Sequence, residues 1–330
     1  MRAKNILIIK LGALGDVVLS TPQLVRLTEA HAGDRMTLLT APAYVDLVAG
    51  LPLQVVAFQR KGFVEMLRVV RWLLGQQFDI VYDLQGSTRS RVMTLLTQAH
   101  KRVGGTRSIA YTHTPLPGSD ARHVFDRLNA VLKAGGIEAA LPVLQLPVSH
   151  AAESSVTAWL QQRQLAARPL VLMHAGGSRR WPSKRWGAAH FLALASALEQ
   201  RGLVIIWIGG EDERTLHGRL AGHAGMDATA VFSLAELLAL AGHAVFALTN
   251  DSGPMHVLSA AGIPVYAFFG PTDWRRSHAL GQAARVLVKP VRCSPCQLPV
   301  CPPEHQHACM QGLTPAAVLA RLEADGLLQS

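Results

Sequence analysis

The chain has 330 residues, of which 49% are hydrophobic and 16% are charged, and its formal net charge is +10. This composition excludes a disordered polymer, and the length suffices for two domains that each bury a core. No apolar run reaches the roughly 18 residues that a membrane-spanning helix needs. The short apolar stretch at residues 6–9 leads into a glycine turn and not into a signal-peptide cleavage site, so we expect a cytoplasmic protein.

The predicted elements alternate between short apolar strands and longer helices along the whole chain. We expect strands at Asn5–Ile9, Met36–Thr40, Gln54–Phe58, Ile80–Asp83, Leu170–His174, Val204–Ile208, Val245–Thr249 and Val265–Phe269. We expect helices at Val17–His31, Phe63–Gln76, Ala151–Gln164, Trp186–Arg201 and Ala235–Gly242. This alternation predicts an α/β protein with parallel sheets covered on both faces.

A break in the pattern near residues 146–150 predicts two domains, residues 1–150 and 151–330. We expect two doubly wound, Rossmann-like domains that face one another across a cleft. Because ligands of such sheets bind beyond the carboxyl ends of the strands, the loops that follow the strands should carry the chemistry.

The first of these loops, residues 10–16 (KLGALGD), follows the first strand and opens a helix. Its glycines allow a tight turn, and the free amides of a helix start attract anions. Asp16 falls in the first helical turn, where it can serve as a general base or simply cap the helix. The loop lacks the G-x-G-x-x-G spacing of a dinucleotide site, and the chain has no P-loop.

The second loop, residues 174–186 (HAGGSRRWPSKRW), combines a glycine-rich strand end with several cations, Lys184 among them. Free amides together with Arg and Lys suit a diphosphate, whereas a solvated basic loop explains the charges alone.

Two later loops add polar groups at the ends of strands. Residues 211–213 are acidic, and Glu213 there can accept hydrogen bonds from ribose hydroxyls or act as a helix-start charge. Residues 250–256 (NDSGPMH) place Asp251, Ser252 and Gly253 at a helix start that suits phosphate or sugar hydroxyls. His256 follows in the first turns, where it can stabilise an anion or simply pack.

Taken together, these segments resemble glycosyltransferase family 9, the ADP-heptose:lipopolysaccharide heptosyltransferase family. The resemblance rests on KLGALGD at residues 10–16, WPSKRW at 181–186 and NDSGPMH at 250–256, and it extends to about residue 315. It implies a GT-B fold and inverting transfer of heptose from ADP-heptose to a lipopolysaccharide inner-core saccharide, without a cofactor or catalytic metal.

The resemblance also implies roles for single residues. Asp16 corresponds to the proposed base, and Lys184 to the lysine that meets the donor diphosphate. Glu213 is the best match to the acidic residue that holds the donor ribose. The segment with Asp251, Ser252, Gly253 and His256 corresponds to the one that surrounds the donor phosphates and sugar.

Other functions stay open at this point. The alternatives are a family 9 enzyme with another nucleotide sugar or a protein acceptor, and a nucleotide-sugar-binding protein without activity. A dehydrogenase is disfavoured because the dinucleotide fingerprint is missing.

The four cysteines, Cys293, Cys296, Cys301 and Cys309, form the pattern C-x2-C-x4-C-x7-C. A C-x2-C unit is a common half of a zinc site, and a cytoplasmic protein rarely carries structural disulfides. A structural zinc or iron and a set of reduced, unliganded thiols are both compatible with this spacing.

The net charge of +10 indicates an anionic partner. No nucleic-acid-binding motif is present, so we expect no nucleic acid. An anionic lipid or a phosphorylated glycan suits the charge, and a generally basic protein is the alternative. The resemblance implies an anionic lipid-linked saccharide as the acceptor and, with it, peripheral contact with the inner membrane. Arg60, Arg89 and Arg122, which follow strands or turns of the N-terminal domain, are the predicted acceptor-binding cations; ordinary solvated charges are the alternative.

Overall fold

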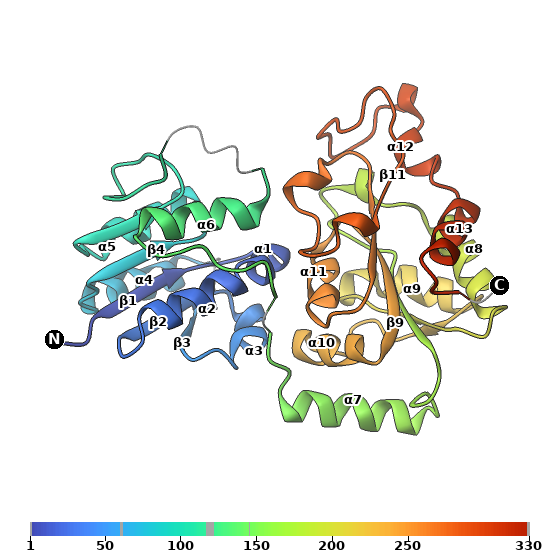
Figure 1. Ribbon diagram of the computed structural model, residues 1–330, viewed down its shortest axis with the longest axis horizontal. Coiled ribbons are helices and arrows are strands. Elements are labelled where there is room, and N and C mark those ends of the chain that lie inside the picture. The colour runs from blue at the N-terminus through green and yellow to red at the C-terminus, as the bar shows by residue number, and fades with distance from the viewer. Residues whose placement is uncertain (1, 60–61, 117–121, 145, 329–330) are drawn as a thin grey trace. The chain divides into compact units, whose positions relative to one another are not determined.

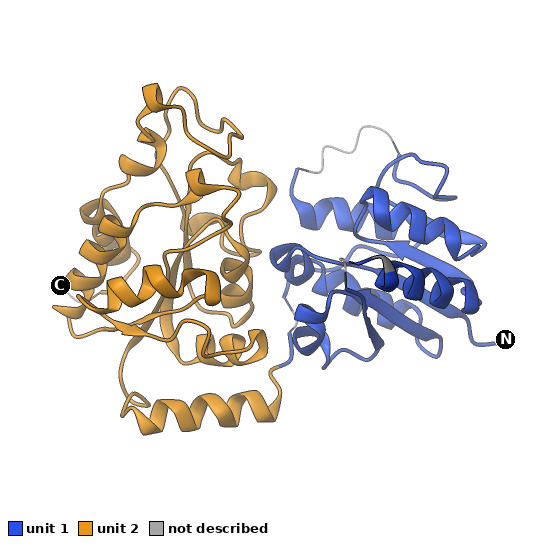
Figure 2. Ribbon diagram, turned by 180° about the vertical axis from the view of Figure 1, so that it is seen from behind, with its two compact units in different colours: residues 1–147 blue, residues 148–330 orange. Residues whose placement is uncertain are grey.

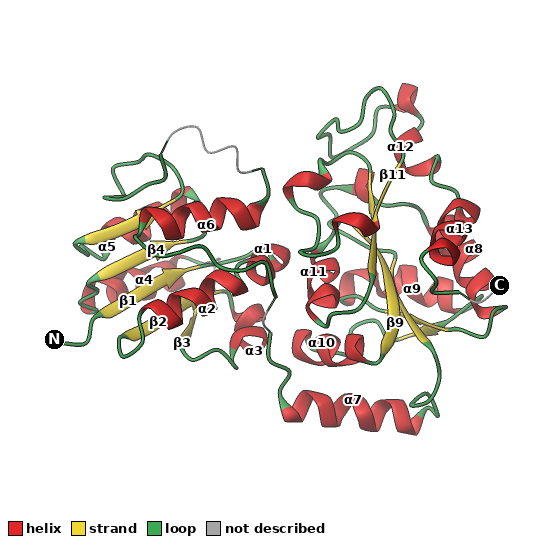
Figure 3. Cartoon of the chain, viewed as in Figure 1, coloured by secondary structure: helices red, strands yellow, loops and turns green. Residues whose placement is uncertain are grey.

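The computed structural model describes residues 2–59, 62–116, 122–144 and 146–328, and the chain divides into two compact units (Figure 2). Unit 1 comprises residues 1–147 and unit 2 residues 148–330. Each unit contains a parallel β-sheet with helices packed on both faces (Figure 3).

Unit 1 has a five-stranded sheet in the order β3-β2-β1-β4-β5. Its strands are β1 (Asn5–Ile9), β2 (Arg35–Thr40), β3 (Gln54–Ala57), β4 (Ile80–Asp83) and β5 (Lys101–Gly104). Its helices are α1 (Leu14–Leu19), α2 (Thr21–Ala30), α3 (Val45–Val48), α4 (Phe63–Gly75), α5 (Thr88–Leu96) and α6 (Val124–Ala134) (Figure 1).

Two separate cores form in unit 1 because side chains alternate across the central strand. Ile6 and Ile8 of β1 pack with α2 and α6 on one face of the sheet. Leu7 and Ile9 pack with α4 and α5 on the other face. These cores fix β1 and β4 at the middle of the sheet, where their carboxyl ends lie next to each other.

Unit 2 has a six-stranded sheet in the order β11-β10-β9-β6-β7-β8. Its strands are β6 (Leu170–His174), β7 (Val204–Trp207), β8 (Met226–Asp227), β9 (Ala244–Asn250), β10 (Val265–Phe269) and β11 (Val286–Val288). Its helices are α7 (His150–Gln162), α8 (Ala188–Glu199), α9 (Arg214–Ala221), α10 (Leu234–Gly242), α11 (Gly253–Ala260), α12 (Ala308–Gln311) and α13 (Pro315–Ala324). Short 3-10 turns η2 (Pro182–Lys184) and η3 (Glu211–Glu213) follow β6 and β7.

An aromatic core fills one face of this second sheet. Trp186 stacks on Phe268 with ring centroids 4.1 Å apart, and Phe191 meets Phe268 edge to face. The indole N–H of Trp186 donates to the carbonyl of Leu313 at 2.6 Å, so the ring is satisfied as well as buried. The loop that carries Lys184 is therefore anchored directly in the core through the tryptophan at its end.

The eight predicted strands are all present, and their ends match the prediction or differ from it by one residue. One prediction was wrong: the single helix expected at Val17–His31 is two helices, because the chain turns at Ser20, whose hydroxyl donates to the carbonyl of Val17. Pro22 then occupies the first turn of α2, where its missing N–H costs nothing. Strands β5, β8 and β11 were not predicted. In the described part of the chain, no helix is long and apolar enough to span a bilayer.

Candidate active site

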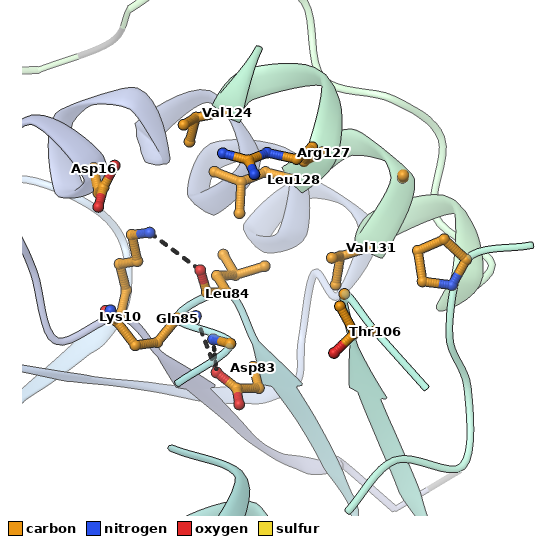
Figure 4. A pocket seen from close by; sticks show the side chains of 14 residues that line it. Lys10, Asp16, Asp83, Leu84, Gln85, Thr106, Val124, Arg127, Leu128 and Val131 are labelled. Atoms are coloured by element: carbon orange, nitrogen blue, oxygen red, sulfur yellow. Dashed lines mark hydrogen bonds between the residues drawn. The ribbon is translucent and has the colours of Figure 1, made fainter. Parts of the chain in front are cut away.

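A cavity of about 330 Å³ opens at the carboxyl end of the sheet in unit 1 (Figure 4). Lys10 at the end of β1 and residues 83–86 at the end of β4 line it, together with Asp16 of α1 and several residues of α6. The cavity thus lies where doubly wound sheets bind their ligands, beyond the carboxyl ends of the parallel strands.

Asp16 is half-buried in the first turn of α1 and lines this cavity. The loop before α1 requires glycine at position 12. Gly12 has φ +128°, and a Cβ there would come within 2.9 Å of the Tyr44 ring. The residue before α1 makes no capping hydrogen bond with its side chain. Asp16 therefore presents its carboxylate to a cavity, which a purely capping role does not require.

Lys10 is 3% exposed and donates from Nζ to the carbonyl of Leu84 at 3.1 Å. Burial lowers the pKa of Lys10, and the carboxylates of Asp16 and Asp83 oppose that effect. The buried cation thus lies between the two carboxylates that face the cavity. Sequence reasoning included Lys10 in the first loop but gave it no role.

Asp83 organises the loop after β4. One of its carboxylate oxygens accepts from the backbone N–H groups of Gln85 and Gly86, both at 2.9 Å, and the other accepts from the Tyr111 hydroxyl at 2.6 Å. Burial, followed by the neighbouring Asp83 carboxylate, raises the pKa of Tyr111, which therefore remains a hydrogen-bond donor. Asp83 is 1% exposed, and with these three hydrogen bonds it fixes the loop that lines the cavity.

Of the three predicted acceptor cations, the two that the structure describes do not line this cavity. Arg89 lies exposed in the first turn of α5, and Arg122 lies exposed just before α6; neither lines the cavity. Arg60 lies outside the described residues. Arg127 of α6 does line the cavity, and sequence reasoning missed it. Its position, one helical turn beyond His123, was the available signal.

In unit 2, Asn250 at the end of β9 joins two of the predicted loops. Its amide N–H₂ group donates to the carbonyls of Ala175 and Gly176 at 3.0 and 2.8 Å, and its oxygen accepts from the backbone N–H of Trp186 at 2.9 Å. Asn250 is fully buried, so all three bonds form away from water. Although the sequence motif includes Asn250, this structural role was not predicted.

Lys184 and Asp251, predicted separately, form an ion pair. Lys184 Nζ lies 2.7 Å from Asp251 Oδ2, which also accepts from the Thr272 hydroxyl at 2.7 Å. The ammonium lies over the Trp181 ring, 5.3 Å from its centroid. The ion pair holds a cation at the strand ends, with its charge balanced by a carboxylate. An incoming diphosphate can compete with that carboxylate for Lys184.

Glu213 lies against the glycine segment after β6. Its carboxylate accepts from the backbone N–H groups of Gly210 at 3.0 Å and Gly177 at 3.4 Å. A Cβ at Gly176 would come within 2.1 Å of the Glu213 side chain, so the close approach requires glycine there. The structure thus brings the second and third predicted loops together at Glu213.

Ser252 contacts a buried histidine. Its hydroxyl lies 3.2 Å from His174 Nδ1 and 3.2 Å from the hydroxyl of Thr249. Burial lowers the pKa of His174 to about 3, with smaller contributions from His217 and Arg185. His174 is therefore neutral and acts as a hydrogen-bonding partner for the loop.

Gly253 begins α11, and His256 is buried in the first turn of that helix. The amides at this helix start follow Asp251 and Ser252 directly, as the sequence predicted for an anion site. Arg185, which was not predicted, donates to the carbonyl of Gly177 at 2.9 Å and closes the glycine segment from the other side.

The cysteine-rich loop packs beneath these donor-side loops. Ser183 N–H donates to the carbonyl of Pro299, and its hydroxyl donates to the carbonyl of Leu298 at 2.7 Å. The Ser294 hydroxyl donates to the carbonyl of Gly270, two residues before Thr272. The loop therefore supports both the turn that carries Lys184 and the segment that holds Asp251.

Cys309 is buried, and the other three cysteines are half-buried. Burial raises the pKa of Cys309 to about 11, and the other three thiols contribute in the same direction. Among the residues that the structure describes, no three His, Cys, Asp or Glu side chains are grouped so as to hold a metal ion. As placed, the thiols do not form a coordination site, so the predicted metal stays a prediction.

Comparison with known proteins decides the family. The sequence profile of glycosyltransferase family 9 (heptosyltransferase) matches residues 66–307, well over half of the chain. The chain belongs to glycosyltransferase family 9. Lipopolysaccharide heptosyltransferase 1 of Pseudomonas aeruginosa is similar at 27% identity, with 97% of each chain covered. Lipopolysaccharide core heptosyltransferase OpsX of Haemophilus influenzae is similar at 21% identity, with 81% of this chain and 80% of the relative covered.

Solved structures of family members share the fold. A family 9 glycosyltransferase of Veillonella parvula superposes with a TM-score of 0.83 at 21% identity, over 97% of this chain and 96% of that one. ADP-heptose lipopolysaccharide heptosyltransferase II of Escherichia coli superposes with a TM-score of 0.78 at 20% identity, over 97% and 98%. The predicted family and the predicted GT-B fold are confirmed.

Proposed function

We propose that this family 9 enzyme transfers heptose from ADP-heptose to a saccharide of the lipopolysaccharide inner core, with inversion at the anomeric carbon. The observation that supports it best is the ion pair of Lys184 with Asp251 at the carboxyl ends of the unit 2 sheet, directly before the start of α11. It combines a cation with the free amides that a nucleotide diphosphate needs. The full-length similarity to a lipopolysaccharide heptosyltransferase supports the same donor and acceptor.

In this mechanism Asp16 is the general base. The acceptor hydroxyl attacks the anomeric carbon, the bond from that carbon to the ADP oxygen breaks, and the hydroxyl proton passes to the Asp16 carboxylate. The half-buried position of Asp16 at the cavity gives it access to a sugar hydroxyl. A positioned base contributes roughly two to four powers of ten to such a step.

The departing diphosphate is stabilised by groups of unit 2. Lys184 exchanges its ion pair with Asp251 for the phosphates, and the amides at the start of α11, from Ser252 and Gly253, donate to phosphate oxygens. His256 lies beside this helix start and completes the phosphate and sugar site. The released Asp251 carboxylate can accept from hydroxyls of the donor sugar.

The adenosine ribose is held by Glu213, whose carboxylate oxygens have lone pairs beyond the two backbone hydrogen bonds that they accept. The acceptor binds in unit 1, where Lys10 and Arg127 line the cavity. Arg89 and Arg122 are exposed and lie only a few residues along the chain from residues that line it. Arg60, which precedes α4, completes the proposed acceptor set.

We expect catalysis to need no metal ion, since Lys184 and Arg185 supply the positive charge that magnesium supplies in other transferases. Because the acceptor is lipid-linked, the enzyme would work in the cytoplasm with peripheral contact to the inner face of the inner membrane.

Two measurements test this function. Calorimetric titration with ADP, UDP and NAD should show tight binding of ADP alone. Incubation with ADP-heptose and defined inner-core saccharides should then yield a heptosylated product. Tight binding of UDP without ADP would replace the donor assignment, and ADP binding without transfer to any core saccharide would replace the acceptor.

A further inference from the structure

The outer face of α4 exposes large apolar side chains. Val64, Leu67 and Leu74 are 62%, 52% and 54% exposed, whereas Val69 and Leu73 of the same helix are buried in the core of unit 1. At 100° per residue, the three exposed side chains lie on one stripe of the helix, opposite the two buried ones. The helix is therefore apolar on two faces, and only one of them has a partner in the described structure.

Arginines complete this stripe. Arg71 falls between Leu67 and Leu74, and Arg68 lies beside them with its side chain 72% exposed. Glu65 is the one carboxylate among the described side chains of α4, and it is paired with Arg68 at 2.6 Å. The outer face of the helix thus combines apolar groups with a net positive charge, since Glu65 balances only one of the two arginines.

Helix α5 extends the same surface. It contacts α4 and packs on the same face of the sheet. Its exposed apolar residues are Val92 and Leu95, at 52% and 39%, and the helix contains no Asp or Glu. We define the α4–α5 surface by seven residues: Val64, Leu67, Arg68, Arg71, Leu74, Val92 and Leu95.

Another exposed helix of the same length shows that this pattern is not general to the chain. Helix α7, like α4, has 13 residues. None of its large apolar side chains is exposed; its exposed residues are His150, Ala151, Ser154, Ser155, Ala158, Gln161 and Gln162. An ordinary solvated helix of this chain therefore does not need exposed leucines, and the α4–α5 surface calls for a partner.

We propose that the α4–α5 surface docks on an anionic phospholipid bilayer. An interfacial helix binds such a bilayer by burying apolar side chains at the headgroup boundary while Arg contacts lipid phosphates. A protein partner with an apolar face would match the leucines and valines but not the two arginines on the same stripe. The overall charge of +10 favours approach to an anionic surface as well.

The position of this surface suits the proposed function, on which this step rests. Helix α4 follows β3 and α5 follows β4, so both helices begin at the sheet edge where Asp83 and Gln85 line the cavity. A bilayer lying along the two helices would present the saccharide of a lipid-linked acceptor at that edge. The same surface would thus hold the enzyme and its acceptor on one membrane.

Co-sedimentation with vesicles tests the proposal. The protein should pellet with phosphatidylcholine vesicles that contain phosphatidylglycerol, and should pellet much less with phosphatidylcholine alone. Replacing Leu67 and Leu74 by Ser, or Arg68 and Arg71 by Gln, should weaken binding to the anionic vesicles by roughly tenfold or more. Because all four side chains are exposed, thermal unfolding should be unchanged in both variants.

Matched controls come from elsewhere on the chain. Replacing Leu141 and Val143, which are 77% and 54% exposed, by Ser removes at least as much exposed apolar surface. Arg168→Gln with Arg219→Gln removes equal charge. These variants should bind vesicles like the unmodified protein. All variants should transfer heptose normally to an acceptor saccharide without acyl chains.

Three outcomes would overturn the proposal: no binding of the unmodified protein to anionic vesicles, equal binding by the α4 variants, or equal loss in the controls. Light scattering tests a fourth outcome. If the unmodified protein is a dimer, and only the variant at Leu67 and Leu74 is a monomer that still binds vesicles, the surface would be assigned to a second copy of the chain. Absence of heptose transfer would contradict the proposed function instead, and would leave the vesicle result standing by itself.

Discussion

At the scale of single residues, Asp16 carries the sharpest prediction. Asp16→Asn keeps the shape of the side chain but removes the base, so kcat should fall by roughly two to four powers of ten while ADP affinity changes little. Steady-state kinetics and calorimetry measure the two quantities. Asp46→Asn is the matched control, because Asp46 also lies in a first helical turn but outside the cavity. Near-normal turnover in Asp16→Asn would leave Asp16 with a helix-start role alone.

Lys184 is predicted to act through the leaving group. Lys184→Ala removes a charge-assisted contact with the diphosphate, so ADP binding should weaken by roughly tenfold to a hundredfold and transfer should slow. Asp251→Ala should raise the donor KM, because it removes the partner that positions Lys184. Arg180→Ala, an exposed cation in the same loop, should change neither. Unaltered ADP affinity in both variants would place the nucleotide elsewhere.

Residue identities could be read from the sequence better than residue partners. The motif at residues 250–256 marked Asp251 and the second loop marked Lys184, but no spacing rule places the two 2.7 Å apart. Asn250 was overlooked for the same reason, since its three bonds reach residues more than 60 positions away. Arg127 was not predicted because it lies in the second turn of α6, whereas the predicted cations lie close to the ends of strands and turns.

At the scale of elements, two buried histidines predict a pH dependence in unit 2. Burial lowers the pKa of His174 to about 3 and that of His217 to about 4, from an ordinary value of 6.5. Below pH 6.5 the unfolded chain therefore binds protons that the folded unit does not, and the free energy of unfolding falls as pH falls from about 6.5 toward 4 and below. At about pH 5 each histidine should lower it by about 2 kcal/mol.

Denaturant unfolding at pH 7 and at about pH 5 measures this effect. His217→Gln keeps a polar side chain near Thr229, whose hydroxyl lies 2.9 Å from His217 Nδ1, but removes the titrating group. The loss of stability between the two pH values should be smaller in this variant than in the unmodified protein. Equal losses in both would show that His217 is not the group responsible.

We expect donor binding to depend on whether the cysteine-rich loop is folded, because this loop supports the turn that carries Lys184. If the four thiols gather around a structural zinc or iron, metal analysis should find about one equivalent, and Cys293→Ser should weaken folding of unit 2 and ADP binding together. Chelator should leave kcat unchanged as long as the cysteine-rich loop stays folded, since no metal is expected at the reacting atoms. Metal-free protein with normal ADP affinity would assign the cysteines to packing.

Elements were predicted well where they are long and strongly apolar. The central strands of both sheets are buried on both faces, and this produces the continuous apolar runs that the prediction used. Strands β5, β8 and β11 lie at sheet edges and are two to four residues long, and β5 and β8 also carry polar side chains such as Lys101 and Asp227. Their pairing is set by the neighbouring strand and not by their own sequence, which is why they were missed.

At the scale of the whole molecule, the charge of +10 predicts a salt-dependent acceptor interaction in unit 1. Arg127→Ala and Arg89→Ala should each raise the acceptor KM by roughly threefold to tenfold at low salt while ADP affinity stays constant. The difference should shrink as ionic strength rises, because salt screens charges separated by more than about 8 Å near physiological strength. Arg168→Ala in unit 2 is the control, and an unchanged acceptor KM at low salt would contradict the basic acceptor surface.

The close approach of Gly176 to Glu213 has a consequence for sequence variation. Any larger residue at position 176 would collide with the Glu213 side chain, at 2.1 Å for a Cβ, unless that side chain became shorter. The two positions should therefore covary among homologues: where 176 is not glycine, 213 should not be glutamate. A double-mutant cycle of Gly176→Ala and Glu213→Ala, which removes the colliding Cγ, would show this as non-additivity, the second change relieving part of the first. A relative that has changed both at once would be the first place to look for a different nucleoside in the donor.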